Sequence, residues 1–140
     1  MAINRIRNHP IGDKMTQQII VDSCGWVALI DAKINLDVEL ERIYGTFQLI
    51  LLDSVDNELN NLESSRPNRK SLLLEMLRSK SNLVSSSLNS HTDDQIFDLA
   101  CSDSYSVLTI DKNLKKRLYE SGISVIEVAK SNHLRLIEGL

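Results

Sequence analysis

Several acidic side chains of this 140-residue sequence stand where short apolar runs end or helical patterns begin. They are Asp22, Glu58, Asp93, Asp94 and Asp111. An acid at a helix start is commonly a cap or a partner of the helix dipole, so each one alone predicts little. Several carboxylates at one place repel one another unless a cation neutralises them. As a group they therefore indicate a cation site.

The ligand chemistry of this group favours a hard divalent ion. Carboxylate oxygens without a thiolate or imidazole are the ligands that suit Mg²⁺ or Mn²⁺. The two cysteines, Cys24 and Cys101, form no C-x-x-C pair, and the three histidines are scattered, so the spacing excludes a zinc site. We expect both cysteines to be buried, reduced thiols.

Short aliphatic runs alternate with helical patterns along the chain, and these must position the acids. The predicted strands are 18–21, 47–52, 82–84, 105–110 and 123–127, with the tail 131–140 as a further edge strand. The predicted helices are 24–33, 36–44, 53–63, 72–80, 93–103 and 112–120. This alternation predicts an α/β fold: a mainly parallel sheet of about five strands, flanked by helices on both faces.

Capping residues define the ends of several of these helices. Asn35 and Gly45 bound the helix 36–44, and Asp111 and Gly122 bound the helix 112–120. Thr92 is the expected cap of the helix that starts at Asp93. Core-facing positions are expected at Val55, Leu59, Leu62, Ile96, Leu99, Ala100, Leu114 and Leu118.

Composition narrows the class of protein. A hydrophobic fraction of 42% and a charged fraction of 25% are typical of a folded globular domain. The net charge of -3 argues against a strongly basic DNA-coating protein. No apolar run has the length of a membrane span or a signal peptide, so we expect a cytoplasmic protein. We predict one domain over 17–140 after a loose leader, 1–16, in which Met15 is an alternative start.

Four segments resemble, in order, the acidic motifs of the PIN domain (PilT N-terminus) nucleases. They are IIVDSCGWVALID, VDNELNNLE, TDDQIFDLA and SVLTIDKNLKKRL. The resemblance covers residues 18 to about 128. It is nearest to small archaeal PIN proteins that are similar to eukaryotic small-subunit rRNA-processing factors. It implies a three-layer α/β/α fold and a metal-dependent endoribonuclease that cleaves single-stranded RNA by water attack.

The resemblance also implies roles for individual residues. Position by position, the catalytic and metal-binding roles go to Asp22, Glu58, Asp94 and Asp111, with Mg²⁺ or Mn²⁺ as cofactor. Asp94 is chosen because D-x-[I/L] matches Asp94-Gln95-Ile96, which makes Asp93 an additional neighbour. Thr109 matches a frequent small polar residue. The sequence departs from the family at Cys24, where many relatives have Asn, and at Asn113, where many have Asp.

Basic residues flank the predicted acidic site. Lys112, Lys115 and Lys116 follow Asp111 on neighbouring positions of one helix, and Arg66 and Lys70 lie in a polar loop. A solvated helix face explains such runs equally well. Next to a metal site, however, they suit the phosphates of RNA. Arg117 is left out because Glu120 or Ser121 is an alternative partner. His91 is expected to be a cap or surface residue and is a candidate for RNA contact only.

Several functions remain open at this point. The first is rRNA processing or maturation; a toxin-type RNase of a toxin–antitoxin pair and a non-catalytic RNA-binding scaffold are the alternatives. RNA is the expected partner, and a homodimer is one assembly open to the chain. A phosphoacceptor receiver domain would use Asp53. That class needs an acidic pair after the first strand and a lysine after the last, and neither is present.

Overall fold

The computed structural model describes residues 16–65, 70–86 and 90–140. Within these ranges the strands are β1 (Gln17–Val21), β2 (Phe47–Leu52), β3 (Ser81–Val84), β4 (Ser106–Leu108), β5 (Val125–Ala129) and β6 (His133–Ile137). The helices are α1 (Ser23–Asp31), α2 (Leu36–Tyr44), α3 (Asp53–Ser65), α4 (Lys70–Ser79), α5 (Thr92–Asp103) and α6 (Lys112–Glu120). A 3₁₀ turn, Lys130–Asn132, joins the last two strands. The expected leader, except Thr16, and Met15 lie outside the described residues.

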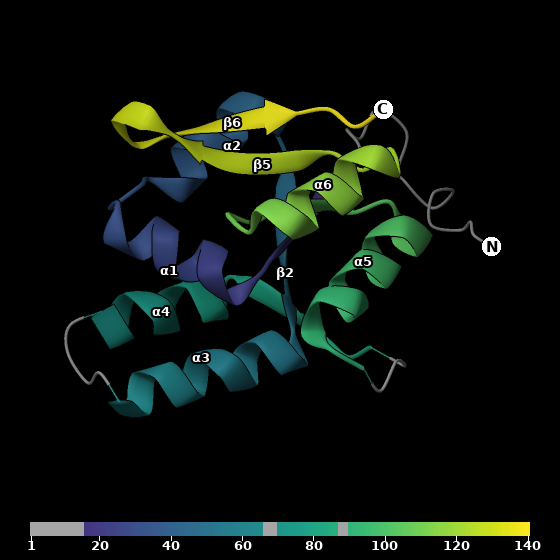
Figure 1. Ribbon diagram of the computed structural model, residues 1–140. Helices are drawn as coiled ribbons and strands as arrows, with labels where there is room; N and C mark the ends of the chain where they lie inside the picture. The colour runs from purple at the N-terminus through teal and green to yellow at the C-terminus, as the bar shows by residue number, and fades with distance from the viewer. Residues whose placement is uncertain (1–15, 66–69, 87–89) are drawn as a thin grey trace.

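The strands form one sheet in the order β3-β2-β1-β4-β5-β6. All neighbours are parallel except β5 and β6, which form an antiparallel hairpin at the edge. Right-handed crossovers place the helices that lead from β1 to β3 on one face and α5 and α6 on the other. Figure 1 shows α1, α3 and α4 together on one side of β2, and α5 beside α6 on the other. The predicted three-layer α/β fold is confirmed.

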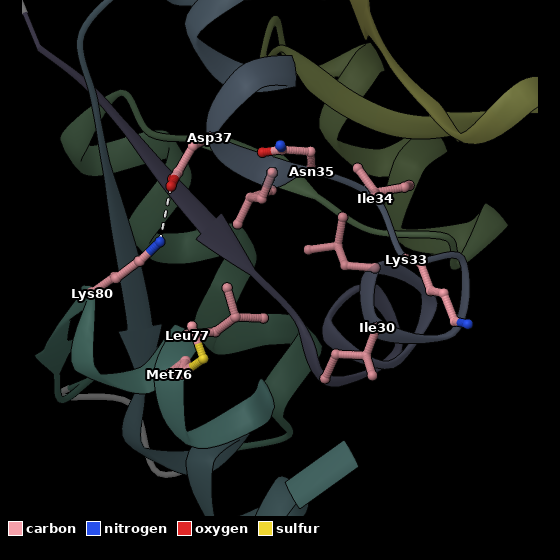
Figure 2. Close-up of a pocket in the computed structure, with 10 residues that line it drawn as sticks. Ile30, Lys33, Ile34, Asn35, Asp37, Met76, Leu77 and Lys80 are labelled. Carbon is pink, nitrogen blue, oxygen red and sulfur yellow. Dashed lines mark hydrogen bonds and ion pairs between the residues drawn. The ribbon is translucent and has the colours of Figure 1, made fainter. Parts of the chain in front are cut away.

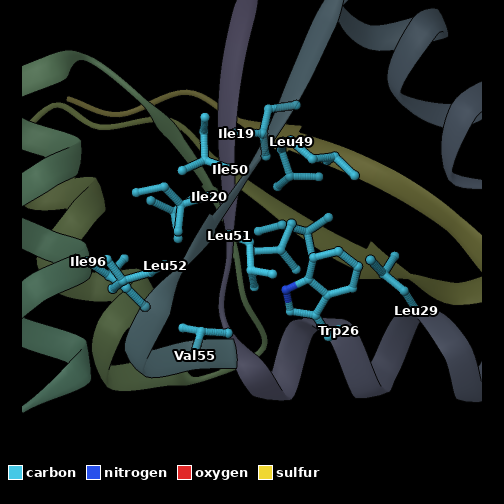
Figure 3. Close-up of a cluster of buried hydrophobic side chains, with 14 of the residues drawn as sticks. Ile19, Ile20, Trp26, Leu29, Leu49, Ile50, Leu51, Leu52, Val55 and Ile96 are labelled. Atoms are coloured by element: carbon cyan, nitrogen blue, oxygen red, sulfur yellow. The ribbon is translucent and has the colours of Figure 1, made fainter. Parts of the chain in front are cut away.

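The core is aliphatic and lies on both faces of the sheet. Ile19, Ile20 and Leu52 have no exposed surface, and Ile96 of α5 packs with them. Trp26 is the one fully buried aromatic side chain of the described residues and lies between α1 and the sheet (Figure 3). Its indole Nε1 is buried and has no hydrogen-bond partner within the described part of the chain. No helix in that part is long and apolar enough to cross a membrane.

Helix bounds agree with the sequence where caps define them. Helices α2 and α6 have the predicted ends; Asn35 and Asp111 cap them, and Gly122 follows α6 with a φ of 82°. Two expectations are wrong. His91, not Thr92, is the N-cap of α5, because its ring Nδ1 accepts from the backbone N–H of Asp93 at 3.2 Å. Leu62, expected in the core, is 40% exposed.

A buried carboxylate fastens the β6 edge to α2. Glu39 of α2 accepts hydrogen bonds from the backbone N–H of Leu134 at 2.9 Å and from Arg42 at 2.9 Å. His133 Nδ1 lies 3.2 Å from its other oxygen. These contacts, first of all the Leu134 N–H, lower the pKa of Glu39 to about 2. The Glu39 carboxylate therefore stabilises the fold at every pH at which it is ionised.

Replacing Glu39 with Gln is expected to lower the melting temperature at pH 7. The pKa of Glu39 is depressed, so its contribution is present above the ordinary value of 4.5 and is lost as the pH falls towards 2. The melting temperatures of wild type and Glu39→Gln should therefore converge between pH 4.5 and 2. Thermal melts over this range test the prediction, with Glu41→Gln, an exposed acid of the same helix, as the control. A constant difference at all pH values would contradict it.

Candidate active site

The acidic residues gather where the sheet changes direction. β1 has β2 on one side and β4 on the other, so the crossovers diverge from this point. Open α/β sheets place their sites outside the carboxyl ends of the strands at such a switch point. Asp22 follows β1 directly, and Asp111 follows β4 at the start of α6. The fold thus brings the first and last predicted acids to one edge of the sheet.

Asp22 is buried and held by three donors. It is 5% exposed and caps α1: Oδ1 accepts from the backbone N–H of Gly25 at 2.7 Å. Its Oδ2 accepts from the hydroxyl of Thr109 at 2.5 Å, and the Cys24 thiol lies 3.2 Å from both oxygens. Burial nevertheless raises the pKa of Asp22, and the charge of Asp93 raises it further. The three donors hold this carboxylate in place.

Gly25 permits the close approach of α1 to β4 that this arrangement needs. A Cβ at this position would lie 2.7 Å from the carbonyl oxygen of Leu108 and 3.0 Å from Oδ1 of Asp22. Backbone cannot yield as a flexible side-chain tip can, so any larger residue would push α1 away from the strand end. Local sequence patterns do not reveal this requirement, because the contact joins residues that are far apart in the chain.

Thr109 connects Asp22 to Asp111. Its side chain is fully buried, and besides donating to Asp22 its hydroxyl accepts from the backbone N–H of Asp111 at 3.0 Å. Asp111 in turn caps α6: its Oδ1 accepts from the N–H groups of Asn113 and Leu114 at 2.8 and 3.1 Å. One buried hydroxyl therefore fixes the relative position of two acids.

Glu58 of α3 is oriented by two hydroxyl groups from other elements. Ser23 at the start of α1 donates to Oε1 at 2.7 Å, and Thr92 at the start of α5 donates to Oε2 at 2.9 Å. The carboxylate thus joins three elements at the same edge of the sheet. Neither hydroxyl was identified as a partner of Glu58 from the sequence, where Thr92 was interpreted only as a helix cap.

Asp93 and Asp94 point in different directions. Asp93 is half-buried, and its pKa is raised first by burial and then by the charge of Asp111, with a further contribution from Glu58. No hydrogen-bond donor among the described residues holds its carboxylate. Asp94 is 51% exposed, and its Oδ1 lies 2.9 Å from Nη1 of Arg117. The residue of the pair that faces the other acids is therefore Asp93, although the motif match selected Asp94.

The reason is helix geometry. Ile96, which is fully buried, anchors the core face of α5. A side chain three positions earlier lies about 60° away, on nearly the same face, whereas one two positions earlier lies about 160° away, on nearly the opposite side. The motif match used a spacing of two, from Asp94 to Ile96. In a helix, the residue three positions before Ile96, which is Asp93, is the one that lies against the sheet edge.

The donor set fits a hard divalent cation chemically. Asp22, Glu58, Asp93 and Asp111 offer carboxylate oxygens. Burial first, and the charges of neighbouring acids second, raise the pKa values of Asp22 and Asp93. In their present positions, no three Asp, Glu, His or Cys side chains of the described residues form a group that could hold a metal ion. Coordination therefore requires a side-chain rotation, and Asp93 is the acid that no hydrogen bond restrains.

The basic residues on α6 divide into two groups. Lys112 and Lys116 are exposed, as predicted. Lys115 is half-buried, with its Nζ 3.3 Å from Oε1 of Glu127, a carboxylate that Arg135 also binds. The Arg117 side chain, for which Glu120 or Ser121 was the alternative partner, pairs with Asp94.

The remaining sequence candidates are placed as follows. Lys70 is the first residue of α4, and Arg66 lies outside the described residues. Cys101 is exposed and not buried as expected. Cys24 is half-buried, and burial followed by the charge of Asp22 raises the pKa of its thiol. The thiol is therefore a neutral neighbour of the acids.

A separate pocket lies at the opposite end of α1. It has a volume of about 290 Å³ and is lined mainly by apolar side chains such as Ile30, Ile34 and Met76 (Figure 2). At its rim Lys80 pairs with Asp37, the one acid of the lining, at 2.8 Å. Asp22 caps the other end of the helix. This pocket is thus distinct from the acidic site.

Comparison with known proteins agrees with this architecture. A family described as "PIN like domain" matches residues 19–131. The curated protein Ribonuclease VapC4 of Methanocaldococcus jannaschii is 26% identical over 125 residues, which cover 85% of this chain and 95% of that protein. A solved structure, the PIN domain endonuclease Utp24, superposes with a TM-score of 0.74 at 23% identity, covering 88% of this chain and 94% of the other. Since the family match extends from within β1 to beyond β5 and contains all the acids, the chain belongs to the PIN-like domain family.

Proposed function

We propose that this protein is a metal-dependent endoribonuclease that hydrolyses phosphodiester bonds in single-stranded RNA. The observation that carries the proposal is the convergence of Asp22, Glu58, Asp93 and Asp111 at the switch point of the sheet. Two of these acids have pKa values raised by burial and by their neighbours, which is the electrostatic state that a divalent cation relieves. The similarity to a ribonuclease and to an endonuclease supports the same reaction class.

Asp22, Asp93 and Asp111 are the proposed ligands of Mg²⁺ or Mn²⁺. In this assignment Asp93 takes the role that the motif match gave to Asp94. When bound, the cation would lower the pKa of water and stabilise negative charge on the phosphate. Thr109 and the Gly25 N–H keep Asp22 oriented, so that this ligand does not reorganise during the reaction.

Glu58 is proposed to act on the cation or on its water. The hydroxyls of Ser23 and Thr92 occupy one lone pair on each oxygen and fix the plane of the carboxylate. A carboxylate oriented in this way can accept a proton from an attacking water molecule. Water attack leaves a 3′-hydroxyl and a 5′-phosphate. Lys112 and Lys116, exposed beside Asp111, are proposed to contact the RNA backbone; Lys115, Arg66 and Lys70 remain candidates.

Incubation with a labelled single-stranded RNA tests the reaction. Cleavage should require Mg²⁺ or Mn²⁺, stop in EDTA and yield 5′-phosphate ends. Asp22→Asn should remove it, whereas Asp53→Asn, which changes an acid that follows β2, should not. Thermal melts followed by circular dichroism check that both variants are folded. Cleavage that survives Asp22→Asn, or metal-independent cleavage, would overturn the proposal; metal-dependent RNA binding without cleavage would favour the scaffold.

For the biological role we propose rRNA processing or maturation, supported by the motif resemblance described above. The alternative is a toxin-type ribonuclease, and the similarity to a curated ribonuclease supports this role to the same extent. Expression in a host cell separates the two. A toxin arrests growth, and the product of a neighbouring inhibitor gene restores it. A processing enzyme changes the ends of precursor rRNA without growth arrest.

A further inference from the structure

Arg117 is held between a carboxylate and an aromatic ring of the neighbouring helix. Its guanidinium carbon lies 4.5 Å from the centroid of the Phe97 ring, and its Nη1 lies 2.9 Å from Oδ1 of Asp94. The side chains of Arg117 and Asp94 are 44% and 51% exposed, so solutes reach the pair. Stacking on a ring holds the planar guanidinium with its donors directed outward, which is the arrangement that recognises oxyanions.

The same guanidinium lies next to the acidic site. Its charge lowers the pKa of Asp93, the residue that precedes Asp94 in the first turn of α5. Figure 1 shows α5 and α6 side by side, with the start of α6 following Asp111. A phosphate adjacent to the one being cleaved would therefore pass close to Arg117.

We propose that Arg117 binds a backbone phosphate of the RNA substrate and that Asp94 occupies this phosphate position in the free protein. The inference rests on the proposed function and adds to it a substrate contact and its resting counterion. An exposed ion pair contributes little to stability, so exchanging it costs little. A phosphate is negatively charged like the Asp94 carboxylate and accepts hydrogen bonds from the same guanidinium N–H groups. A phosphate can therefore replace Asp94 as the partner of Arg117.

The two roles for Asp94 predict opposite results. If Asp94 competes with RNA for Arg117, Asp94→Asn frees the guanidinium and strengthens RNA binding. If Asp94 is a metal ligand, Asp94→Asn lowers the rate of cleavage. In that case its RNA affinity without metal should equal that of any other variant in which one acid is replaced by its amide. Asp98, an exposed acid one turn further along α5, supplies the matched control, because Asp98→Asn removes one charge from the same helix.

The experiment measures equilibrium binding of a fluorescent single-stranded oligoribonucleotide by anisotropy in EDTA. Asp94→Asn should bind more tightly than wild type by up to roughly fivefold, the equivalent of one surface ion pair. Arg117→Gln should bind more weakly, with a salt slope that is less steep by about 0.7, the contribution of one phosphate on a single strand. Arg117→Lys should fall between wild type and Arg117→Gln, since it keeps the charge without the paired donors.

The double variant decides the mechanism. Asp94→Asn should bring no gain in the Arg117→Gln background, because the gain acts through Arg117. A gain that persists there, or an equal gain in Asp98→Asn, would overturn the inference in favour of a general charge effect. Binding in EDTA is independent of cleavage. Wild-type protein that binds in this pattern but cleaves no RNA with any metal would therefore refute the nuclease proposal and support the phosphate contact.

Discussion

Asp93→Asn is expected to lower metal-dependent RNA cleavage by more than about 100-fold, the upper end of the losses seen when an outer-shell partner of a metal site is removed. Asp93 is half-buried between the charges of Asp111 and Glu58. As the unrestrained acid of the group, it is free to turn onto a cation. Asn keeps the shape but cannot supply the charge. Asp94→Asn should retain cleavage, because its carboxylate faces Arg117.

The same variant should stabilise the metal-free protein. The pKa values of Asp22 and Asp93 are raised in the folded protein. Their contribution to the free energy of unfolding is therefore largest below the ordinary value of 3.8 and is lost as the pH rises through the raised values. In EDTA the wild type should therefore melt at a lower temperature at pH 7 than at pH 5. Asp93→Asn removes part of this repulsion, and its melting temperature at pH 7 should be higher by roughly 2–4 °C.

Cleavage assays and melts in EDTA, with Asp98→Asn as the control, measure both effects. A lower melting temperature for Asp93→Asn would identify Asp93 as a structural residue at the start of α5. Full activity in Asp93→Asn together with inactivity in Asp94→Asn would restore the assignment made from the motif.

Thr109→Val is the second change with a large expected effect. Valine has nearly the volume of threonine, so the core stays filled while the hydrogen bonds of the buried hydroxyl to Asp22 and to the N–H of Asp111 disappear. Removing one of the three donors of a buried carboxylate costs about 1–3 kcal/mol. The Thr109 hydrogen bond lowers the pKa of Asp22, so its loss raises that pKa further. Less of Asp22 is then ionised at a given pH.

Cleavage by Thr109→Val should fall by roughly 10–100-fold at neutral pH, as for other partners that orient a metal ligand. The acid limb of its pH–rate profile should also move to higher pH. A merely structural role would lower the melting temperature without moving this limb. Thr109→Ser, which keeps the hydroxyl, should restore the wild-type limb. An unmoved limb in Thr109→Val would show that the hydroxyl does not tune Asp22.

Local signals in the sequence were sufficient for elements with strong caps or long apolar runs. α2, α6 and β2 have the predicted bounds, because a capping side chain, a terminating glycine or a mostly apolar run of a strand's length acts over a few neighbouring residues. The alternation of these elements was sufficient for the α/β fold. The tail forms the further edge strand that the sequence predicted, and it pairs antiparallel with β5.

Strand ends depended on pairing and were less predictable. β4 contains only 106–108 of the predicted 105–110, because the chain leaves the sheet where Thr109 turns towards Asp22. β5 begins at Val125 and not at Ile123, in register with β4 and β6. An apolar run specifies that a strand forms; its neighbours decide which residues are paired.

The sequence by itself determined that Asp22 follows one strand and that Asp111 follows another, because strands and caps are local features. Only the tertiary structure placed Asp93 near Asp111 and Glu58 and paired Asp94 with Arg117, since both contacts join separate elements. It also assigned Lys115 to Glu127, and it revealed Gly25, Ser23 and Thr92 as supports of the site. These contacts join residues that are distant in the chain, and local patterns carry no information about distances between separate elements.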